Sequence, residues 1–284
     1  MACEAYRETR FKKQAPAEPC CVDSSTQVLV ADLSWRSAGA VQVGEELVGV
    51  DATVPGPKKQ RRLRRTKVTA IHRFAASRCV VDTDQGAIVV TPNHQFLVTR
   101  CNGRGEWNNG WYWVNASKLN KRDRIARLCR LWTPLWDRDA GWLAGLYDGE
   151  GCVTNARRIG ALFATVYQAP GIVLDKARLL LKLYGFYGSE TLDKNSGVIG
   201  LKTYGVDRII ELLGALRPER LIQTFQRVLD AGTAPAKSKT PALVRVCTPT
   251  SDGTVIGIET STKTLITHGF VSRGFYRLRS EIRK

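Results

Sequence analysis

The sequence predicts an α+β protein with β-rich segments toward both ends and a mixed helical and strand segment between them. Three observations support this class. Short apolar strands recur at close spacing between residues 26 and 91, helices alternate with pairs of strands from about residue 138 to residue 231, and the strand pattern returns after residue 254. Short strands separated by turn residues are typical of an all-β unit, so we expect the chain to begin and end in such structure.

The first part of the chain is expected to be a leader followed by short strands. Residues 1–20 are charged and contain Pro16 and Pro19, so we expect them to lack a fold of their own. After residue 21, apolar and polar residues alternate or form short apolar runs, which predicts strands. The predicted strands are Thr26–Val30, Glu46–Val50, Lys67–Ile71, Cys79–Asp82 and Ala87–Thr91.

A strongly basic run lies within this β-rich segment. Seven of the ten residues from Lys58 to Lys67 are cationic. Such a run repels itself and is typical of a flexible loop, either solvated without a partner or in contact with nucleic-acid phosphates. The residues that would make phosphate contacts are Lys58, Lys59, Arg61, Arg62, Arg64 and Arg65.

A glycine-spaced helix is expected to begin near Arg138. Gly141, Gly145 and Gly149 recur every four residues, which places them on one side of a helix. Each costs roughly 1 kcal/mol relative to alanine, so we expect this face to meet another backbone closely. The helix ends in Asp148 and Glu150, where the helix dipole disfavours negative charge. We therefore expect a positive partner there, most simply a divalent cation.

Two hairpins and three further helices are expected after this helix. The predicted helix that begins near Pro170 has an apolar stripe of Val173, Ala177, Leu180, Leu181 and Tyr184. The other predicted elements are the hairpins Cys152–Arg157 with Ala161–Gln168 and Gly188–Leu192 with Gly197–Lys202, and the helices Val206–Leu216 and Pro218–Ala231.

The stretch Leu143-Ala-Gly-Leu-Tyr-Asp-Gly-Glu-Gly151 resembles the LAGLIDADG signature of homing endonucleases. The resemblance implies an αββαββα domain over residues 135–232 that hydrolyses double-stranded DNA with Mg²⁺ or Mn²⁺. Because only one signature is present, it implies a homodimer joined through the glycine face. Glu150 would be the catalytic acid and metal ligand, with Asp148 in a supporting role and Lys202 and Gln168 near the active site. The expected DNA contacts are Thr154, Asn155, Arg157, Arg158, Lys194 and Lys202, of which strand alternation allows about half to face DNA.

Other segments resemble the Hint fold of inteins and related autoprocessing proteins. The resemblance is carried by Cys21-Val-Asp-Ser-Ser-Thr26, Val43-Gly-Glu-Glu-Leu47, Thr91-Pro-Asn-His94, Trp113–Leu119 and the β pattern of Thr254–Ser272. It implies one Hint domain in two segments, 21–131 and 241–275, with the LAGLIDADG domain inserted between them. Cys21 would attack the preceding carbonyl to form a thioester, His94 would protonate the departing nitrogen, and Thr91 would position the peptide.

The chain departs from the intein pattern at its C-terminal end. Inteins close with His-Asn, whereas the corresponding place after Ser272 reads Arg273-Gly-Phe275. His268 lies five residues before Arg273, too early to replace the missing histidine. Without the asparagine side chain no succinimide can form, so we expect full splicing to fail. An initial acyl shift at Cys21 remains an open alternative.

The composition limits the classes of partner and compartment. A chain of 284 residues with a net charge of +17 points to a polyanionic partner, most simply nucleic acid. The eight cysteines form no CxxC pair, which argues against a structural zinc site, and their scatter argues against a disulfide framework. No run of about 18 apolar residues exists, so we expect no membrane span. We expect a cytoplasmic protein, and the family resemblance implies a phage or bacterial mobile element.

The sequence leaves three functions to compare. We expect a homing endonuclease, because an acid is retained at Glu150 and the terminal asparagine is lost. The alternatives are autoprocessing at Cys21 and DNA binding without cleavage. A site-specific cut that depends on Mg²⁺ and on Glu150 would separate the first function from the other two.

Overall fold

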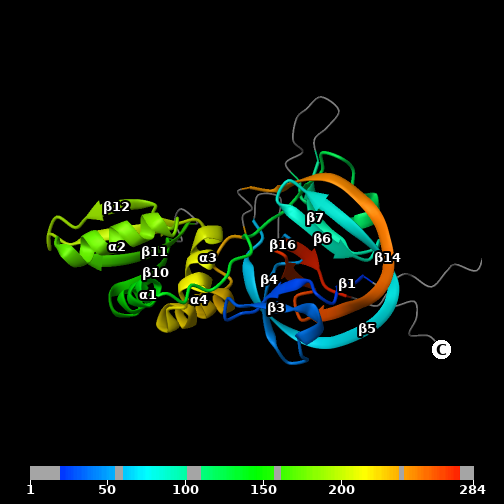
Figure 1. Cartoon of the computed structure of the whole chain (residues 1–284), viewed down its shortest axis with the longest axis horizontal. Helices are drawn as coiled ribbons and strands as arrows, with labels where there is room; N and C mark the ends of the chain where they lie inside the picture. The colour runs from blue at the N-terminus through cyan, green and yellow to red at the C-terminus, as the bar shows by residue number, and fades with distance from the viewer. Residues whose placement is uncertain (1–19, 55–59, 101–109, 157–160, 237–239, 276–284) are drawn as a thin grey trace, which may run out of the picture.

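The computed structural model describes residues 20–54, 60–100, 110–156, 161–236 and 240–275. The predicted leader therefore lies outside the described residues, apart from Cys20. Figure 1 shows two units, a large curled β unit and a smaller unit in which helices cover a sheet. Within the described residues, no helix is long and apolar enough to cross a membrane.

Twelve strands of the described residues form the sheet of the β unit. Their order is β3-β2-β15-β16-β7-β9-β14-β1-β6-β5-β4, and β8 pairs with β7 at the side. The strands are β1 (Val22–Asp23), β2 (Gln27–Leu29), β3 (Trp35–Ser37), β4 (Glu46–Val50), β5 (Leu63–Thr83), β6 (Gly86–Val90), β7 (Gln95–Thr99), β8 (Tyr112–Asn115), β9 (Arg124–Ile125), β14 (Ala242–Thr260), β15 (Thr264–Thr267) and β16 (Phe270–Arg273).

Two long strands frame this unit. β5 and β14 pair antiparallel from Val244↔Thr83 to Thr260↔Val68, and Figure 1 shows both curling around the shorter strands. β5 also contains two strands that the sequence pattern separates, Lys67–Ile71 and Cys79–Asp82. The intervening residues alternate between more and less buried positions, so the ladder continues through them.

The smaller unit is built as helix, two strands, helix, two strands and two helices. Its four strands are antiparallel in the order β10-β11-β13-β12. The elements are α1 (Arg138–Glu150), β10 (Gly151–Ala156), β11 (Ala161–Gln168), α2 (Ile172–Leu183), β12 (Ser189–Leu192), β13 (Ile199–Tyr204), α3 (Val206–Leu216) and α4 (Glu219–Ala231). The predicted elements are therefore confirmed to within a few residues. In α2 the buried residue of the first turn is Leu174, whereas the predicted Val173 is 38% exposed.

The helices cover one face of this four-stranded sheet. Ala164 and Val166 of β11 are buried and pair with Thr203 and Leu201 of β13, which are also buried. Paired residues share a face, and neighbours along a strand alternate between faces. The intervening residues therefore form a second face, which we call the open face. Lys202, which is half-buried, and the paired Thr165, which neighbouring side chains bury, lie on it.

The smaller unit is an insertion between two paired strands of the larger one. It leaves the β unit after β9 and returns at β14, where Ala242 lies opposite Ile125. A continuous apolar cluster contains residues from both units, among them Leu33 and Val50 of the β unit and Leu213 and Phe225 of the helices. The insertion is therefore packed into the core of the chain.

The basic run takes part in this packing. Arg65 pairs with Glu46 at 2.9 Å and bridges to Asp230 of α4, with one contact at 2.6 Å. Arg62 donates to the carbonyl of Thr233 at 3.0 Å, and Arg64 pairs with Asp51 at 2.7 Å.

Arg61, the remaining predicted DNA contact among the described residues of this run, donates to the carbonyl of Asp51 at 2.7 Å and lies over the Trp113 ring. The prediction of a flexible loop is therefore wrong for the described residues 60–67, because acids and carbonyl groups of the protein neutralise or bind these arginines. Lys58 and Lys59 lie outside the described residues.

Candidate functional site

The Cys20–Cys21 peptide bond is held at the start of β1 by Thr91. The Cys21 amide donates to Thr91 Oγ1 at 2.9 Å, and the Thr91 amide donates back to the Cys21 carbonyl at 3.0 Å. Thr91 is buried directly after β6, which places its hydroxyl against this amide. The structure thus brings two of the three predicted processing residues, Cys21 and Thr91, into direct contact.

His94 lies beside the side chain of Cys20, the residue on the acyl side of the same peptide bond. Its amide donates to the Thr91 carbonyl at 2.9 Å, so residues 91–94 form a turn that fixes the imidazole. The ring is 1% exposed and contacts the edge of Phe96 at a centroid distance of 4.8 Å. Nδ1 lies 3.7 Å from the Cys20 thiol, and Nε2 has no hydrogen-bond partner among the described residues. Burial lowers the pKa of His94 to about 3, so the ring is neutral at neutral pH.

The thiol that faces His94 belongs to Cys20, not to the predicted nucleophile Cys21. Cys21 instead points into a small apolar cluster with Val255 and Phe275. Successive side chains of an extended chain point to opposite sides, so only one of two adjacent cysteines can face the histidine. Burial raises the pKa of Cys21 far above its ordinary value and that of Cys20 to about 11, so both are protonated thiols at neutral pH. In the sequence, only its position next to Cys21 indicates that Cys20 could belong to the site.

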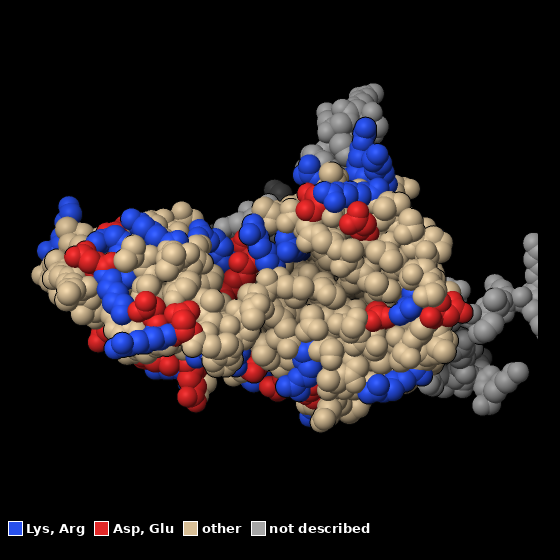
Figure 2. Space-filling model, in the orientation of Figure 1, with Lys and Arg blue, Asp and Glu red and all other residues tan. Residues whose placement is uncertain are grey.

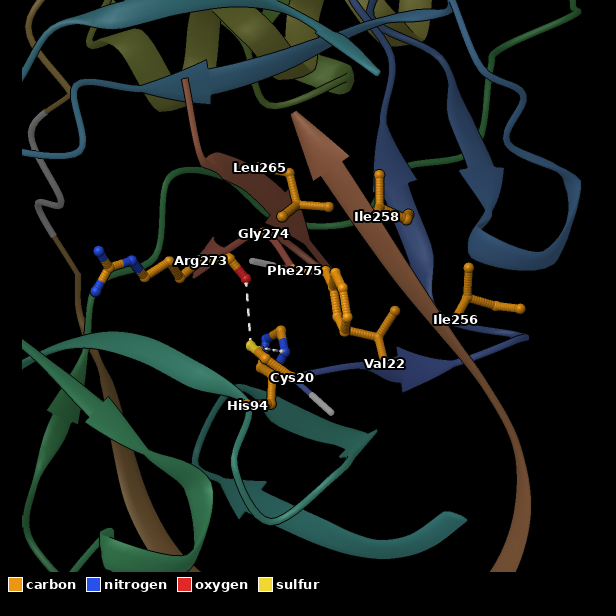
Figure 3. A pocket seen from close by; sticks show the side chains of 9 residues that line it. All are labelled: Cys20, Val22, His94, Ile256, Ile258, Leu265, Arg273, Gly274 and Phe275. Atoms are coloured by element: carbon orange, nitrogen blue, oxygen red, sulfur yellow. Dashed lines mark hydrogen bonds between the residues drawn. The ribbon is translucent and has the colours of Figure 1, made fainter. Parts of the chain in front are cut away.

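The C-terminal end of the β unit reaches the same place. The Cys20 thiol donates to the carbonyl of Arg273, the last residue of β16, at 3.8 Å. Figure 3 shows Cys20, His94 and Arg273 around one small pocket, with Phe275 beside them. The structure therefore brings the Cys20–Cys21 segment and the end of β16 side by side. His268 lies in the turn between β15 and β16 with φ +49° and does not line this pocket.

The acids at the end of α1 have different surroundings. Asp148 accepts from the backbone amides of Glu219 and Arg220 at 2.9 Å each, and so caps the start of α4. The Arg220 side chain in turn donates to carbonyl groups at the end of α1, among them that of Gly151 at 2.7 Å. The positive end of a helix thus meets the Asp148 carboxylate, and an arginine meets the carbonyl groups at the end of α1.

Glu150 is exposed at the end of α1, and the glycine face beside it is open. A Cβ added to Gly141, Gly145 or Gly149 would meet nothing within 4 Å. The close backbone neighbour expected for these glycines is therefore not found among the described residues. The described residues also hold no group of three or more His, Cys, Asp or Glu side chains that could bind a metal ion. One chain thus supplies Glu150 as a single carboxylate, which does not make an Mg²⁺ site by itself.

The other predicted endonuclease residues are divided between the two faces of the small sheet. Lys202 lies on the open face, paired with Thr165, and its Nζ is over the Phe163 ring. Gln168 pairs with Ile199, two positions along from the buried pair Val166 and Leu201. It therefore lies on the helix-covered face. Gln168 and Lys202 therefore extend from opposite faces of the sheet, and their expected place near Glu150 stays a prediction.

The predicted DNA contacts can be placed only in part. Thr154 lies on the open face opposite Phe163 and is exposed, and Lys194 is exposed beyond β12. Figure 2 shows cationic side chains over the small unit mixed with acidic ones, not a uniformly basic surface. The side chain of Asn155 and the whole of Arg157 and Arg158 lie outside the described residues.

Comparison with known proteins finds similar structures only. No protein-family model and no curated protein matches the chain. A DnaB intein from Synechocystis sp. PCC 6803 is 8% identical with a TM-score of 0.40, over 89% of this chain and 97% of that chain. The gp41-1 intein is 8% identical with a TM-score of 0.37, over 89% and 98%. A bacterial intein-like domain from Clostridium thermocellum is 9% identical with a TM-score of 0.38, over 89% and 97%.

Proposed function

We propose that the β unit is an autoprocessing domain of the intein type, which acts on the Cys20–Cys21 peptide bond. The observation that carries this proposal is the hydrogen bond from the Cys21 amide to Thr91 Oγ1, with His94 in contact with the side chain of Cys20 on the acyl side of the same bond. The residues that hold the bond are those whose pattern resembles the Hint blocks. The contact between the Cys20 thiol and the Arg273 carbonyl, at the other end of the β unit, supports the same function.

The proposed reaction is an acyl shift from nitrogen to sulfur. The Cys21 sulfur attacks the Cys20 carbonyl carbon, the carbon–nitrogen bond breaks, and the thiol proton ends on the freed Cys21 amine. Thr91 fixes the departing nitrogen and His94 relays the proton. For this attack the Cys21 side chain has to leave the cluster with Val255 and Phe275. Because Gly274 follows Arg273 where an intein has its asparagine, the reaction stops at the thioester, which water or an added thiol then cleaves.

Incubation of the purified chain with dithiothreitol tests this function. Intact mass spectrometry is expected to show a fragment that begins at Cys21, and Cys21→Ala is expected to abolish it. Cys152→Ala is the matched control, because Cys152 lies in the small unit and is expected to change nothing. Absence of the fragment from the wild-type chain, or its persistence in Cys21→Ala, would exclude the acyl shift.

A second candidate function, cleavage of double-stranded DNA by a homodimer, is favoured by the small unit. Its element order matches the αββαββα arrangement that the LAGLIDADG resemblance implies. The open glycine face of α1 provides a surface on which a second copy could pack, and it ends at the exposed Glu150. Pairing two copies along this face would bring two Glu150 carboxylates together, which supports cleavage of both strands.

Selection of cleaved sites from a random DNA library, with Mg²⁺ or Mn²⁺ present, tests this second function. The wild-type chain is expected to yield a defined cut, and Glu150→Gln is expected to bind the selected site without cutting it. If the wild-type chain binds a site but cuts it with neither metal, DNA binding without cleavage becomes the better description.

A further inference from the structure

The Cys20 thiol is placed for a reaction that the Cys21 acyl shift does not use. Its sulfur contacts His94 Nδ1 at 3.7 Å and the carbonyl oxygen of Arg273 at 3.8 Å. Figure 3 shows the three groups converging at the pocket. A thiol, a fully buried imidazole and a peptide carbonyl from a distant part of the chain are thus in one cluster.

Both sides of the Arg273–Gly274 peptide bond are held in place. On the acyl side, the Arg273 guanidinium donates to Gln95 Oε1 at 3.1 Å and lies over the Trp113 ring. On the amine side, the Gly274 amide donates to the Lys263 carbonyl at 3.0 Å and the Phe275 amide donates to the Ile258 carbonyl at 2.8 Å. Such restraint keeps the carbonyl beside the sulfur and lowers the entropic cost of attack.

We propose that Cys20 is a second nucleophile, which cleaves the Arg273–Gly274 peptide bond. The sulfur attacks the Arg273 carbonyl carbon and forms a thioester between Cys20 and Arg273. The carbon–nitrogen bond breaks, and the thiol proton passes through His94 to the freed Gly274 amine. Water or an added thiol then cleaves the thioester, which restores the Cys20 thiol. The step shares the site of the proposed autoprocessing function but does not need the Cys21 acyl shift.

The surroundings of Cys20 determine how this reaction depends on pH. The titratable and charged groups at its sulfur are His94, Cys21 and Arg273. Burial raises the pKa of Cys20 to about 11, although a hydrogen bond with the Gln95 backbone and the positive charge of Arg273 partly oppose this. The reactive thiolate fraction therefore grows about tenfold for each pH unit between 7 and 10. Cys247 is the other thiol whose reactivity has to be tested, because the hydrogen bond from Cys79 lowers its pKa to about 7.

The test follows cleavage of the full chain at pH 9 with hydroxylamine, which traps thioesters, and reads the products by intact mass. Wild type is expected to release the peptide Gly274–Lys284 and to leave a chain that ends at Arg273, about tenfold more slowly at pH 8. Cys20→Ala is expected to slow this release at least tenfold. Cys152→Ala and Cys247→Ala, which change cysteines outside this site, are expected to leave the release unchanged.

The products separate this inference from the proposed function. Cleavage before Cys21 and cleavage after Arg273 give different masses, so either can fail alone. In Cys20→Ala, a thiol-induced fragment that begins at residue 21 would show that the site is still folded. The inference is overturned if wild type releases no Gly274–Lys284 peptide, or if Cys20→Ala releases it at the wild-type rate. It is also overturned if Cys247→Ala, rather than Cys20→Ala, abolishes the release.

Discussion

Thr91 is the residue through which the proposed processing site holds the Cys20–Cys21 peptide bond. Replacing it with valine keeps the shape but leaves the buried Cys21 amide without its acceptor. An unsatisfied buried donor costs about 1–3 kcal/mol, so Thr91→Val is expected to lower thermal stability and to slow thiol-induced cleavage before Cys21 about tenfold or more. Melting curves and intact mass measure the two effects. Cleavage at the wild-type rate would remove Thr91 from the proposed mechanism.

His94 is expected to make the fold sensitive to acid. Its pKa is about 3 in the folded chain against an ordinary value of 6.5, so between these values the unfolded chain binds the extra proton. Stability therefore falls as pH falls from 6.5 toward 3, by up to about 1.4 kcal/mol per pH unit. Urea unfolding of wild type and His94→Gln at pH 6 and pH 4.5 measures this difference. Equal losses in both chains would show that His94 is not buried as a neutral ring.

At the scale of elements, α1 and α4 stabilise each other at their ends. Asp148 caps the start of α4, so Asp148→Ala is expected to cost about 1 kcal/mol of unfolding free energy. Glu150→Gln is the matched control two residues away, because Glu150 is exposed at the helix end and its change is expected to leave stability within about 0.5 kcal/mol. Urea unfolding measures both. If Glu150→Gln lost more unfolding free energy than Asp148→Ala, Asp148 would not be the acid that stabilises this contact between α1 and α4.

The glycine face of α1 provides a second prediction at this scale. A Cβ at Gly145 meets nothing in the isolated chain, so Gly145→Ala is expected to raise monomer stability by up to about 1 kcal/mol through helix propensity. If two copies pack along this face, the same change is expected to weaken their association. Melting at low concentration and sedimentation at high concentration separate the two effects. Destabilisation of the monomer would show that the face is already occupied.

At the scale of the whole molecule, the shared apolar cluster predicts joint unfolding of the two units. Helix residues such as Leu213 and Phe225 belong to the same cluster as Leu33 and Val50 of the β unit, and Arg65 bridges to Asp230 across the contact. Calorimetry is therefore expected to show one cooperative transition. Two well-separated transitions would show that the insertion folds independently of the β unit.

Much of the local structure could be predicted from the sequence. The helix Val206–Leu216 and the strand Glu46–Val50 were placed at their observed bounds, because periodicity and turn residues are local properties. The sequence does not predict the structure of the basic run, because its acid partners, Asp51 and Asp230 among them, are remote in sequence or in another element. Charge density alone does not show which acids a fold will bring near.

The sequence by itself determined the two units, the insertion of one into the other, and the segments that hold Thr91 and His94. Only the tertiary structure decided which of two adjacent thiols faces His94, which side of the small sheet carries Lys202, and that Cys20 contacts Arg273. The physical reason is that strand parity and the pairing of distant segments depend on the packed register of the whole sheet, which no local pattern specifies.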